Sequence, residues 1–338
     1  MKKLISLICV LAMVLALAAC GSSAPAAATE APAASTEAPA EDVSADKTFV
    51  VGICQLVQHP ALDAATQGFK DALTEALGDK VTFQEQNASG DSATCSLICN
   101  QFVSDEVDLI MANATASIQA AASATNTIPI LGTSITDYGV ALGVDNWTGV
   151  SGTNISGTSD LAPLDGQAAM IQELFPDEKT IGLLYCSGEP NSIFQADSME
   201  ALLTDMGYSV ERYTFADSND VSSVTANACS NADVLYIPTD NTAASCTEAI
   251  NNVALSAGIP IVAGEEGIAA GCGVATLSIS YYDLGRATGE MAAEILTEGA
   301  DVSTMEVRFA PAFTKEYNAD ICEALNITVP DDYVAIAK

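Results

Sequence analysis

The side chains that could perform covalent chemistry are few in this chain of 338 residues. His59 is the only histidine, and the nucleophiles that it could activate are Ser187 and Cys54. The sequence has no Gly-x-Ser-x-Gly segment, which would place a serine at a nucleophile elbow. Cys95 and Cys99 would share one helix face, but a second cysteine pair with zinc-site spacing is lacking. We therefore expect no catalytic residue, no metal and no cofactor, and an extracellular hydrolase is the least favoured function.

Acidic and amide side chains offer binding chemistry instead. Asp240, with Asn241 beside it, could pair with a ligand ammonium, and Glu189 and Glu265 are further candidates. Asp240 could also cap the helix that begins near Thr242, and the two roles can coexist, whereas Glu189 and Glu265 could simply be exposed, solvated acids. The complete set of predicted ligand contacts is Gln55, His59, Ser89, Thr115, Thr136, Asp137, Ser187, Glu189, Asp240, Asn241 and Glu265.

A ligand carboxylate would have to be bound almost without positive side chains. The chain carries 11 Lys and Arg against 44 Asp and Glu, a net charge of −33. The first 46 residues hold two lysines and five acids, so nine bases and 39 acids remain in the rest of the chain. Backbone N–H groups at helix N-termini, with the hydroxyls of Ser89, Thr115, Ser117 and Thr136, are the predicted donors. The charge also excludes nucleic acid as a partner and argues against a multiply charged anionic ligand.

Strands and helices must position these residues, and the hydrophobic pattern predicts both. From residue 48 onward, short β-branched apolar runs alternate with longer amphipathic stretches. The first half predicts strands at 49–53, 81–83, 108–111 and 128–131, and helices at 61–77, at 92–104 and after 115. The second half repeats this order, with strands at 180–185, 209–215, 233–237 and 259–262, and helices at 192–206, 220–229 and 242–257.

The two halves of the sequence resemble each other. Gly52 matches Gly182, Asp108 matches Asp233, and an Ile-Pro-Ile triplet occurs at the corresponding place in each half. Strands that alternate with helices imply parallel sheets that are covered on both faces. The predicted fold class is therefore α/β, with two similar doubly wound parallel-sheet lobes.

The loops at the carboxyl ends of the strands are the predicted binding loops, because ligands of open α/β sheets bind there. They lie at 55–59, 87–90, 113–115 and 133–137 in the first half, and at 187–191, 216–218, 239–241 and 264–267 in the second. They are rich in Ser, Thr, Asn, Asp and Glu, which suit a small polar ligand, although any single one could merely cap a helix. Two such rims would form a cleft that closes by a hinge.

The first 46 residues have the composition of an export signal and a spacer. Lys2 and Lys3 precede an apolar run at 4–17, and Leu17-Ala18-Ala19-Cys20 follows. This pattern predicts a lipoprotein signal peptide at 1–19 with Cys20 as the lipidated residue; an ordinary secretory peptide or an uncleaved anchor is the alternative. Residues 22–46 are Ala, Pro, Ser, Thr and Glu in the main, which predicts a flexible linker. The predicted location is the extracytoplasmic face of the cell membrane.

Several segments after the linker carry a family resemblance. They are 51–63 (VGICQLVQHPALD), 114–116 (ATA), 135–137 (ITD), 146–151 (NWTGVS), 237–242 (IPTDNT) and 283–289 (DLGRATG). In these segments the sequence resembles the substrate-binding lipoproteins of ABC transporters, in the tryptophan/tyrosine-type group, which have the type I periplasmic-binding-protein fold. It departs from the family at Asp137-Tyr138, where Asp-Pro is common, and this change could alter the pocket wall.

The resemblance implies a function and its partners. A monomeric, lipid-anchored protein would capture a small zwitterion, such as an aromatic or other apolar amino acid, and deliver it to an ABC permease with its ATPase. The alternatives are a ligand-sensing receptor subunit and a binding protein for another small solute, a nucleoside or a sugar.

The resemblance also implies a chain path with strand exchange between the lobes. The first lobe would consist of 47–160 and about 281–305, and the second of 161–280 and about 306–338, joined by a hinge. Trp147 would pack near this hinge or stack on a ligand, and Arg286 and Glu290 would form a surface ion pair on the returning helix.

Overall fold

The computed structural model describes residues 47–310 and 312–337. The predicted signal peptide, the lipidation site Cys20 and the predicted linker lie outside these residues. The described residues all belong to one compact unit. Within the described part, no helix combines the length and the apolar character that a bilayer-spanning segment needs.

Strands and helices alternate along most of the chain. The strands are β1 Phe49–Gln55, β2 Val81–Asn87, β3 Leu109–Asn113, β4 Ile130–Ile135, β5 Ile155–Ser159, β6 Thr180–Cys186, β7 Ser209–Phe215, β8 Val234–Ile237, β9 Ile261–Ala263, β10 Ala275–Ser278, β11 Arg308–Phe309, β12 Thr314–Tyr317 and β13 Val334–Ala335. The α-helices are α1 Pro60–Leu77, α2 Ser92–Ser104, α3 Thr115–Ala124, α4 Tyr138–Leu142, α5 Leu164–Leu174, α6 Pro190–Asp205, α7 Val221–Cys229, α8 Asn241–Ser245, α9 Thr247–Ala257, α10 Glu266–Cys272, α11 Tyr281–Glu298 and α12 Ala319–Leu325. Two short 3₁₀ helices occur at Gly78–Lys80 and Val302–Thr304.

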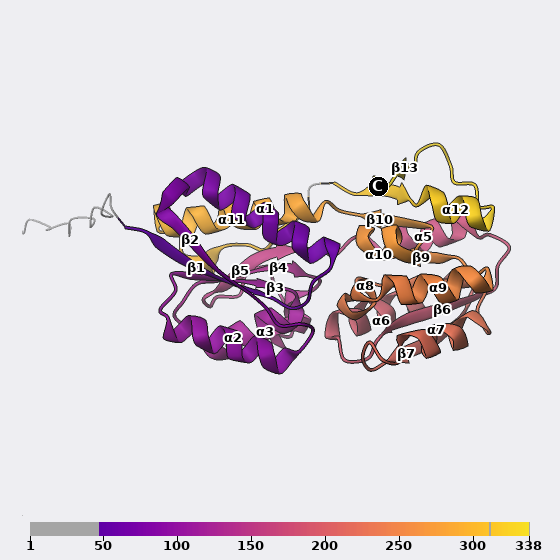
Figure 1. Cartoon of the computed structure of the whole chain (residues 1–338), viewed down its shortest axis with the longest axis horizontal. Coiled ribbons are helices and arrows are strands. Elements are labelled where there is room, and N and C mark those ends of the chain that lie inside the picture. Colours follow the sequence, from indigo (N-terminus) through magenta and orange to yellow (C-terminus); the bar gives the residue numbers. More distant parts are fainter. Residues whose placement is uncertain (1–46, 311, 338) are drawn as a thin grey trace, which may run out of the picture. The chain divides into compact units, whose positions relative to one another are not determined.

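The first sheet has the order β11-β5-β4-β3-β1-β2, and all its pairings are parallel. Helices α1 and α11 cover one face, and α2 and α3 cover the other (Figure 1). Side chains of β1 alternate between the two, with Val51 and Ile53 packed toward α1 and Cys54 toward α2. The strand is therefore buried on both faces, as its continuous apolar run predicts.

The second sheet has the order β13-β12-β10-β9-β8-β6-β7. Its pairings are parallel except that β12 runs antiparallel to β10. Helices α5, α6 and α12 pack on one face, and α7, α8, α9 and α10 pack on the other. Two α/β lobes with mostly parallel sheets confirm the predicted fold class, although the antiparallel strand was not part of that prediction.

The internal repeat is visible in one matched contact. The Asp108 carboxylate accepts a hydrogen bond from the Val50 N–H at 2.8 Å, and the Asp233 carboxylate accepts one from the Thr180 N–H at 2.8 Å. Both aspartates precede an inner strand and tie it to the start of the strand beside it. The matched aspartates therefore make the same hydrogen bond between neighbouring strands in the two halves.

The chain returns to the first sheet after β10. Helix α11 packs along α1, and β11 then pairs with β5. A Cβ on Gly68 or Gly285 would lie about 2 Å from a backbone oxygen of the other helix, so both glycines are required for this close packing. Because β11 belongs to the first sheet, the chain leaves that sheet only after Phe309, a few residues beyond the expected crossing near residue 306.

Several elements differ from the sequence prediction. Strands β5 and β10 were not predicted, because ISGTS and ATLS hold one large apolar side chain each. The helix expected at 242–257 is broken at Cys246 into α8 and α9. Arg286 does not pair with Glu290, since its guanidinium binds Glu75 on α1 at 2.7 and 3.0 Å. Packing of α11 against α1 brings that partner closer than the neighbour on the same helix.

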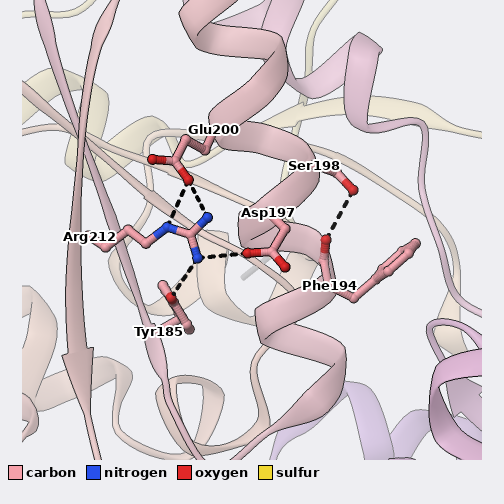
Figure 2. A network of polar contacts seen from close by, with 6 residues as sticks. All are labelled: Tyr185, Phe194, Asp197, Ser198, Glu200 and Arg212. Atoms are coloured by element: carbon pink, nitrogen blue, oxygen red, sulfur yellow. Dashed lines mark hydrogen bonds and ion pairs between the residues drawn. The ribbon is translucent and has the colours of Figure 1, made fainter. Parts of the chain in front are cut away.

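A cluster around Arg212 holds α6 against the second sheet (Figure 2). Arg212 on β7 donates to Asp197 at 2.7 Å and makes two hydrogen bonds to Glu200, both on α6. It also donates to the Tyr185 hydroxyl on β6 at 3.2 Å. The cluster fixes the helix whose first residues reach the cleft described below.

Candidate functional site

Two adjoining cavities lie between the strand-end loops of the two lobes. The inner cavity has a volume of about 10 Å³, room for about one water molecule. Its lining residues are His59, Leu62, Ser134, Thr136, Asp160, Asn191, Thr239, Asp240, Asn241, Ala244, Glu265 and Tyr281. The outer chamber has a volume of about 330 Å³ and shares Asn241 with the inner cavity. Its other lining residues are Leu56, Val57, Ser89, Gly90, Ser92, Ala116, Cys186, Gly188, Glu189, Ala216, Asp217, Ser218, Thr242 and Ser245.

Three buried carboxylates surround the inner cavity. Asp160 follows β5, Asp240 follows β8 and Glu265 follows β9, and none is more than 3% exposed. Burial raises the pKa of Asp160 to about 6 and that of Glu265 to about 7. Burial, and then the nearby Glu189 charge, also raise the pKa of Asp240. No Lys or Arg is among the residues that line either cavity in the described part, so a cationic ligand group would relieve this negative charge.

Two of these carboxylates are already satisfied by backbone N–H groups. Asp240 accepts hydrogen bonds from the Ala243 N–H at 2.8 Å and the Cys186 N–H at 2.7 Å. Glu265 accepts from the N–H groups of Gly267 and Ile268 at 2.7 and 2.5 Å. The capping role that the sequence left open for both residues is therefore the one that the structure contains.

One carboxylate oxygen of Asp160 has no hydrogen-bond partner. Its Oδ2 accepts a hydrogen bond from the Tyr281 hydroxyl at 2.9 Å, while its Oδ1 is buried without a partner. Ser134 Oγ and His59 Nδ1 are also buried and unpartnered, and all three residues line the inner cavity. Because buried polar atoms are normally hydrogen-bonded, these three atoms are free binding groups.

Ser134 owes its position to an irregularity in β4. The register between β4 and β5 shifts between Gly132 and Ile135, and Ser134 has a left-handed backbone with φ of 56°. Such bulges turn a side chain away from the regular alternation of a strand, often beside a binding site. The irregular backbone at Ser134 thus occurs at a residue that lines the inner cavity.

One hydrogen bond joins the two lobes across the cavity. His59 Nε2, before α1, lies 3.3 Å from Asn241 Oδ1, at the start of α8. Burial lowers the pKa of His59, although the Asn241 contact and the charges of Glu189 and Asp63 oppose the change. His59 makes no hydrogen bond to Ser187 or Cys54 in the described part, so the pairing that a hydrolase would need is not formed.

The structure brings seven of the eleven predicted contacts to the cavities. They are His59, Thr136, Asp240, Asn241 and Glu265 at the inner cavity, and Ser89 and Glu189, together with Asn241, at the outer chamber. Their direct contact with a ligand stays a prediction.

Four predicted contacts lie elsewhere. Gln55 is buried and bonded to Asp63 and Thr66 within the first lobe, and Thr115 is buried at the start of α3. Asp137 caps α4 by accepting from the Val140 N–H at 2.7 Å. Ser187 is exposed and donates to the Phe215 carbonyl at 3.2 Å. All four residues lie at the carboxyl ends of strands, but the side chains of Gln55, Asp137 and Ser187 are hydrogen-bonded within their own lobe, and Thr115 is buried there.

Ser117 and Tyr138 are also used in the protein core. Ser117 Oγ lies 3.6 Å from the thiols of both Cys54 and Cys95, away from the cavities, so it is not a donor to a ligand carboxylate. The Tyr138 hydroxyl donates to the carbonyls of Gly132 and Thr158, and its ring stacks on Trp147 at 5.7 Å. The departure from the family pattern at Tyr138 therefore fills the core and does not line either cavity.

Five polar residues of the inner cavity were not among the predicted contacts: Ser134, Asp160, Asn191, Thr239 and Tyr281. Ser134, Asn191 and Thr239 lie within predicted loops, and Tyr281 was expected only as the start of a helix. Asp160 was missed because β5 was missed. Had ISGTS been recognised as a buried strand, the strand-end rule would have selected Asp160.

Comparison with known proteins identifies the family. The family model for the ABC transporter substrate binding protein matches residues 50–338. The tyrosine-binding protein of Clostridioides difficile (strain R20291) is 38% identical over 280 residues, which cover 82% of this chain and 81% of that protein.

Solved structures give the same result. The ABC domain in complex with L-Trp from Streptococcus pneumonia is 31% identical with a TM-score of 0.80, and the match covers 84% of this chain and 97% of that one. A ligand-free, open substrate-binding protein with adhesive properties from Clostridium difficile is 37% identical with a TM-score of 0.66, over 86% of this chain and 99% of that one. This structure thus fits the L-Trp complex better than the open protein, although the open protein is closer in sequence.

These matches confirm the predicted type I periplasmic-binding-protein fold and the predicted function class. The chain belongs to the family of ABC transporter substrate-binding proteins.

Proposed function

We propose that the protein captures an aromatic amino acid in the cleft between its lobes and delivers it to its permease. The observation that carries this proposal is the inner cavity, where buried carboxylates and three unpartnered polar atoms meet without a Lys or Arg. The amino-acid ligands named for the two relatives above, tyrosine and L-Trp, support the same class of ligand.

The ligand ammonium is proposed to bind at Asp160. Its Oδ1 is the one carboxylate oxygen of the inner cavity that has no partner in the described structure, since the oxygens of Asp240 and Glu265 accept backbone N–H groups. A buried ion pair with an ammonium would satisfy this oxygen and neutralise the surplus negative charge.

The ligand carboxylate is proposed to bind near the start of α3. No side chain caps this ten-residue helix, its N-cap Ala114 has φ of 89°, and Ala116 lines the outer chamber. Side chains cap α2, α4, α8 and α10, whereas α1, α5, α6, α7 and α9 have no side-chain cap, as in α3. Free N–H groups at a helix start are suited to an anion, and neither cavity has a Lys or Arg among its lining residues in the described part of the chain.

The aromatic ring is proposed to occupy the outer chamber. Its volume of about 330 Å³ falls within the usual range of ligand pockets, and Leu56, Val57, Ala116 and Ala216 supply apolar walls. The inner cavity is too small for an amino acid, so the lobes must separate before the ligand enters and close again around its ammonium.

A titration panel tests the proposal. Purified protein is titrated calorimetrically with the aromatic amino acids, other apolar amino acids, nucleosides and simple sugars. We expect binding of at least one aromatic amino acid. At a ligand concentration 100 times Kd, this binding should also raise the free energy of unfolding by about 2.7 kcal/mol, which a thermal-shift measurement would detect. Binding of only nucleosides or sugars would reject the amino-acid ligand.

The N-terminal region is proposed to attach this protein to the membrane. Residues 1–19 would be removed on export, Cys20 would carry the lipid, and residues 22–46 would separate the lobes from the bilayer. The protein would act as a monomer without covalent chemistry, because capture and release of a solute require none.

A further inference from the structure

We propose that Glu189 and Asn241 hold His59 as its neutral Nε2–H tautomer in the closed cleft, so that Nδ1 accepts a hydrogen bond from a primary ammonium. This inference rests on the proposed amino-acid function. It gives the second lobe a part in recognising the ammonium, although Glu189 is a positioning residue with no proposed contact to that group.

Glu189 fixes the orientation of the Asn241 amide. Its carboxylate accepts from the Asn241 Nδ2 at 2.7 Å and the Asn241 N–H at 3.0 Å. It also accepts from the Thr242 N–H, the Thr242 hydroxyl and the Asn191 amide at 2.8, 2.7 and 3.2 Å. A carboxylate surrounded by donors can only accept, so the NH₂ group of Asn241 must face Glu189 and its oxygen must face away.

The oriented amide then sets the tautomer of His59. Asn241 Oδ1 lies 3.3 Å from His59 Nε2, and an amide oxygen can only accept. His59 Nε2 therefore carries the proton, and in the neutral ring Nδ1 is left with a lone pair. This Nδ1 is the buried atom without a partner, in a residue that lines the inner cavity.

Three acceptors are thus available around one small cavity. They are His59 Nδ1, Ser134 Oγ and Asp160 Oδ1, each buried and each unpartnered in the described structure. A primary ammonium has three N–H donors, which is the number of these acceptors. Each N-methyl group replaces one donor and adds bulk to a cavity of about 10 Å³, so the site discriminates against N-methylated amino acids.

The described titratable groups around His59 are acidic or neutral, so they favour a bound cation and include no cation of their own. Asp63 on α1 and Glu189 before α6 act on the imidazole, and Asp160, Asp240 and Glu265 line the same cavity. Tyr281 also lines it, as a neutral hydroxyl that donates to Asp160. An imidazolium would lose the Nδ1 acceptor, and burial lowers the pKa of His59 in the closed cleft, so ligand binding should weaken as the pH falls and the imidazole becomes protonated.

The experiment uses the single histidine as its probe. Full-length protein without an affinity tag is labelled with ¹⁵N-histidine, and long-range ¹H–¹⁵N spectra are recorded at pH 7.5 with saturating L-tyrosine or L-tryptophan, whichever binds. We expect a protonated Nε2 and an unprotonated Nδ1. A protonated Nδ1 in this complex, as the other tautomer or as imidazolium, would overturn the inference without using any variant.

Affinity measurements complete the test. Asn241→Leu should mix the two tautomers and weaken amino-acid binding at least tenfold, and Asn231→Leu, at an exposed position of the same lobe, is the matched control. The N-methyl derivative of the same amino acid should bind the wild type at least tenfold more weakly. Unchanged tautomer and affinity in folded Asn241→Leu would reject the inference while the proposed function stands. Failure of the wild type to bind any amino acid would reject both.

Discussion

At the scale of single residues, Asp160 is the most important side chain, because it is a buried carboxylate with one unpartnered oxygen, and no Lys or Arg lines the inner cavity among the described residues. Asp160→Asn keeps the shape but removes the charge. We expect at least an approximately 100-fold loss of affinity for the amino acid, since the ammonium would be buried without its counter-ion. Asp79→Asn, an exposed position, is the control for calorimetric titration. Equal affinities of the two variants would contradict the assignment.

The same substitution should have the opposite effect on stability. Burial raises the pKa of Asp160 from its ordinary 3.8 to about 6, so the folded protein holds this proton more tightly than the unfolded chain does. The resulting penalty is absent below about pH 3.8, grows as the pH rises and is complete above about pH 6. At pH 7 it is of the order of 2–3 kcal/mol. Ligand-free Asp160→Asn should therefore melt at a higher temperature than the wild type at pH 7, with little difference at pH 4; a lower melting temperature at pH 7 would contradict this.

Helices set the positions of these residues, and α1 and α11 pack closely against each other. His59 precedes α1 and Tyr281 begins α11, so both cavity residues depend on how these helices meet. Gly285→Ala would place a methyl group 2.0 Å from the Ala65 carbonyl oxygen. We expect a loss of about 2–4 kcal/mol in unfolding free energy by urea titration, since backbone atoms must move. Glu290→Ala, exposed on the same helix, should change it by less than about 0.5 kcal/mol. A neutral Gly285→Ala would show that this packing is not tight in solution.

The elements also show how far the sequence predicts the molecule. Strands such as β1 and β6 are continuous apolar runs and were predicted, whereas β5 is buried with small and polar side chains that carry no hydrophobic signal. Because β5 was not predicted, Asp160, which follows this strand, was not selected as a site residue. The strand-end rule located the loops of His59, Asp240 and Glu265, but it could not show that Gln55 and Asp137 are bonded within their own lobe. Which side chains are left unpartnered depends on tertiary contacts that no local pattern contains.

At the scale of the whole molecule, membrane attachment is separate from ligand binding. Cys20→Ala should leave the amino-acid affinity unchanged, because all proposed contacts lie beyond the linker. The variant should be lost from the membrane fraction and should no longer incorporate a radiolabelled fatty acid in growing cells. Wild-type labelling together with continued labelling of Cys20→Ala would contradict the predicted lipid site, and Ser22→Ala is the control.

Ligand capture by the two lobes is the central claim, and one titration series tests it most directly. Wild-type protein and Asp160→Asn are titrated at pH 7.5 with the best-binding aromatic amino acid and with its analogue in which hydrogen replaces the ammonium group. The account predicts that the wild type binds the amino acid and prefers it to the analogue by at least about 100-fold, and that Asp160→Asn loses most of this preference. Equal binding of the two compounds by the wild type would contradict it.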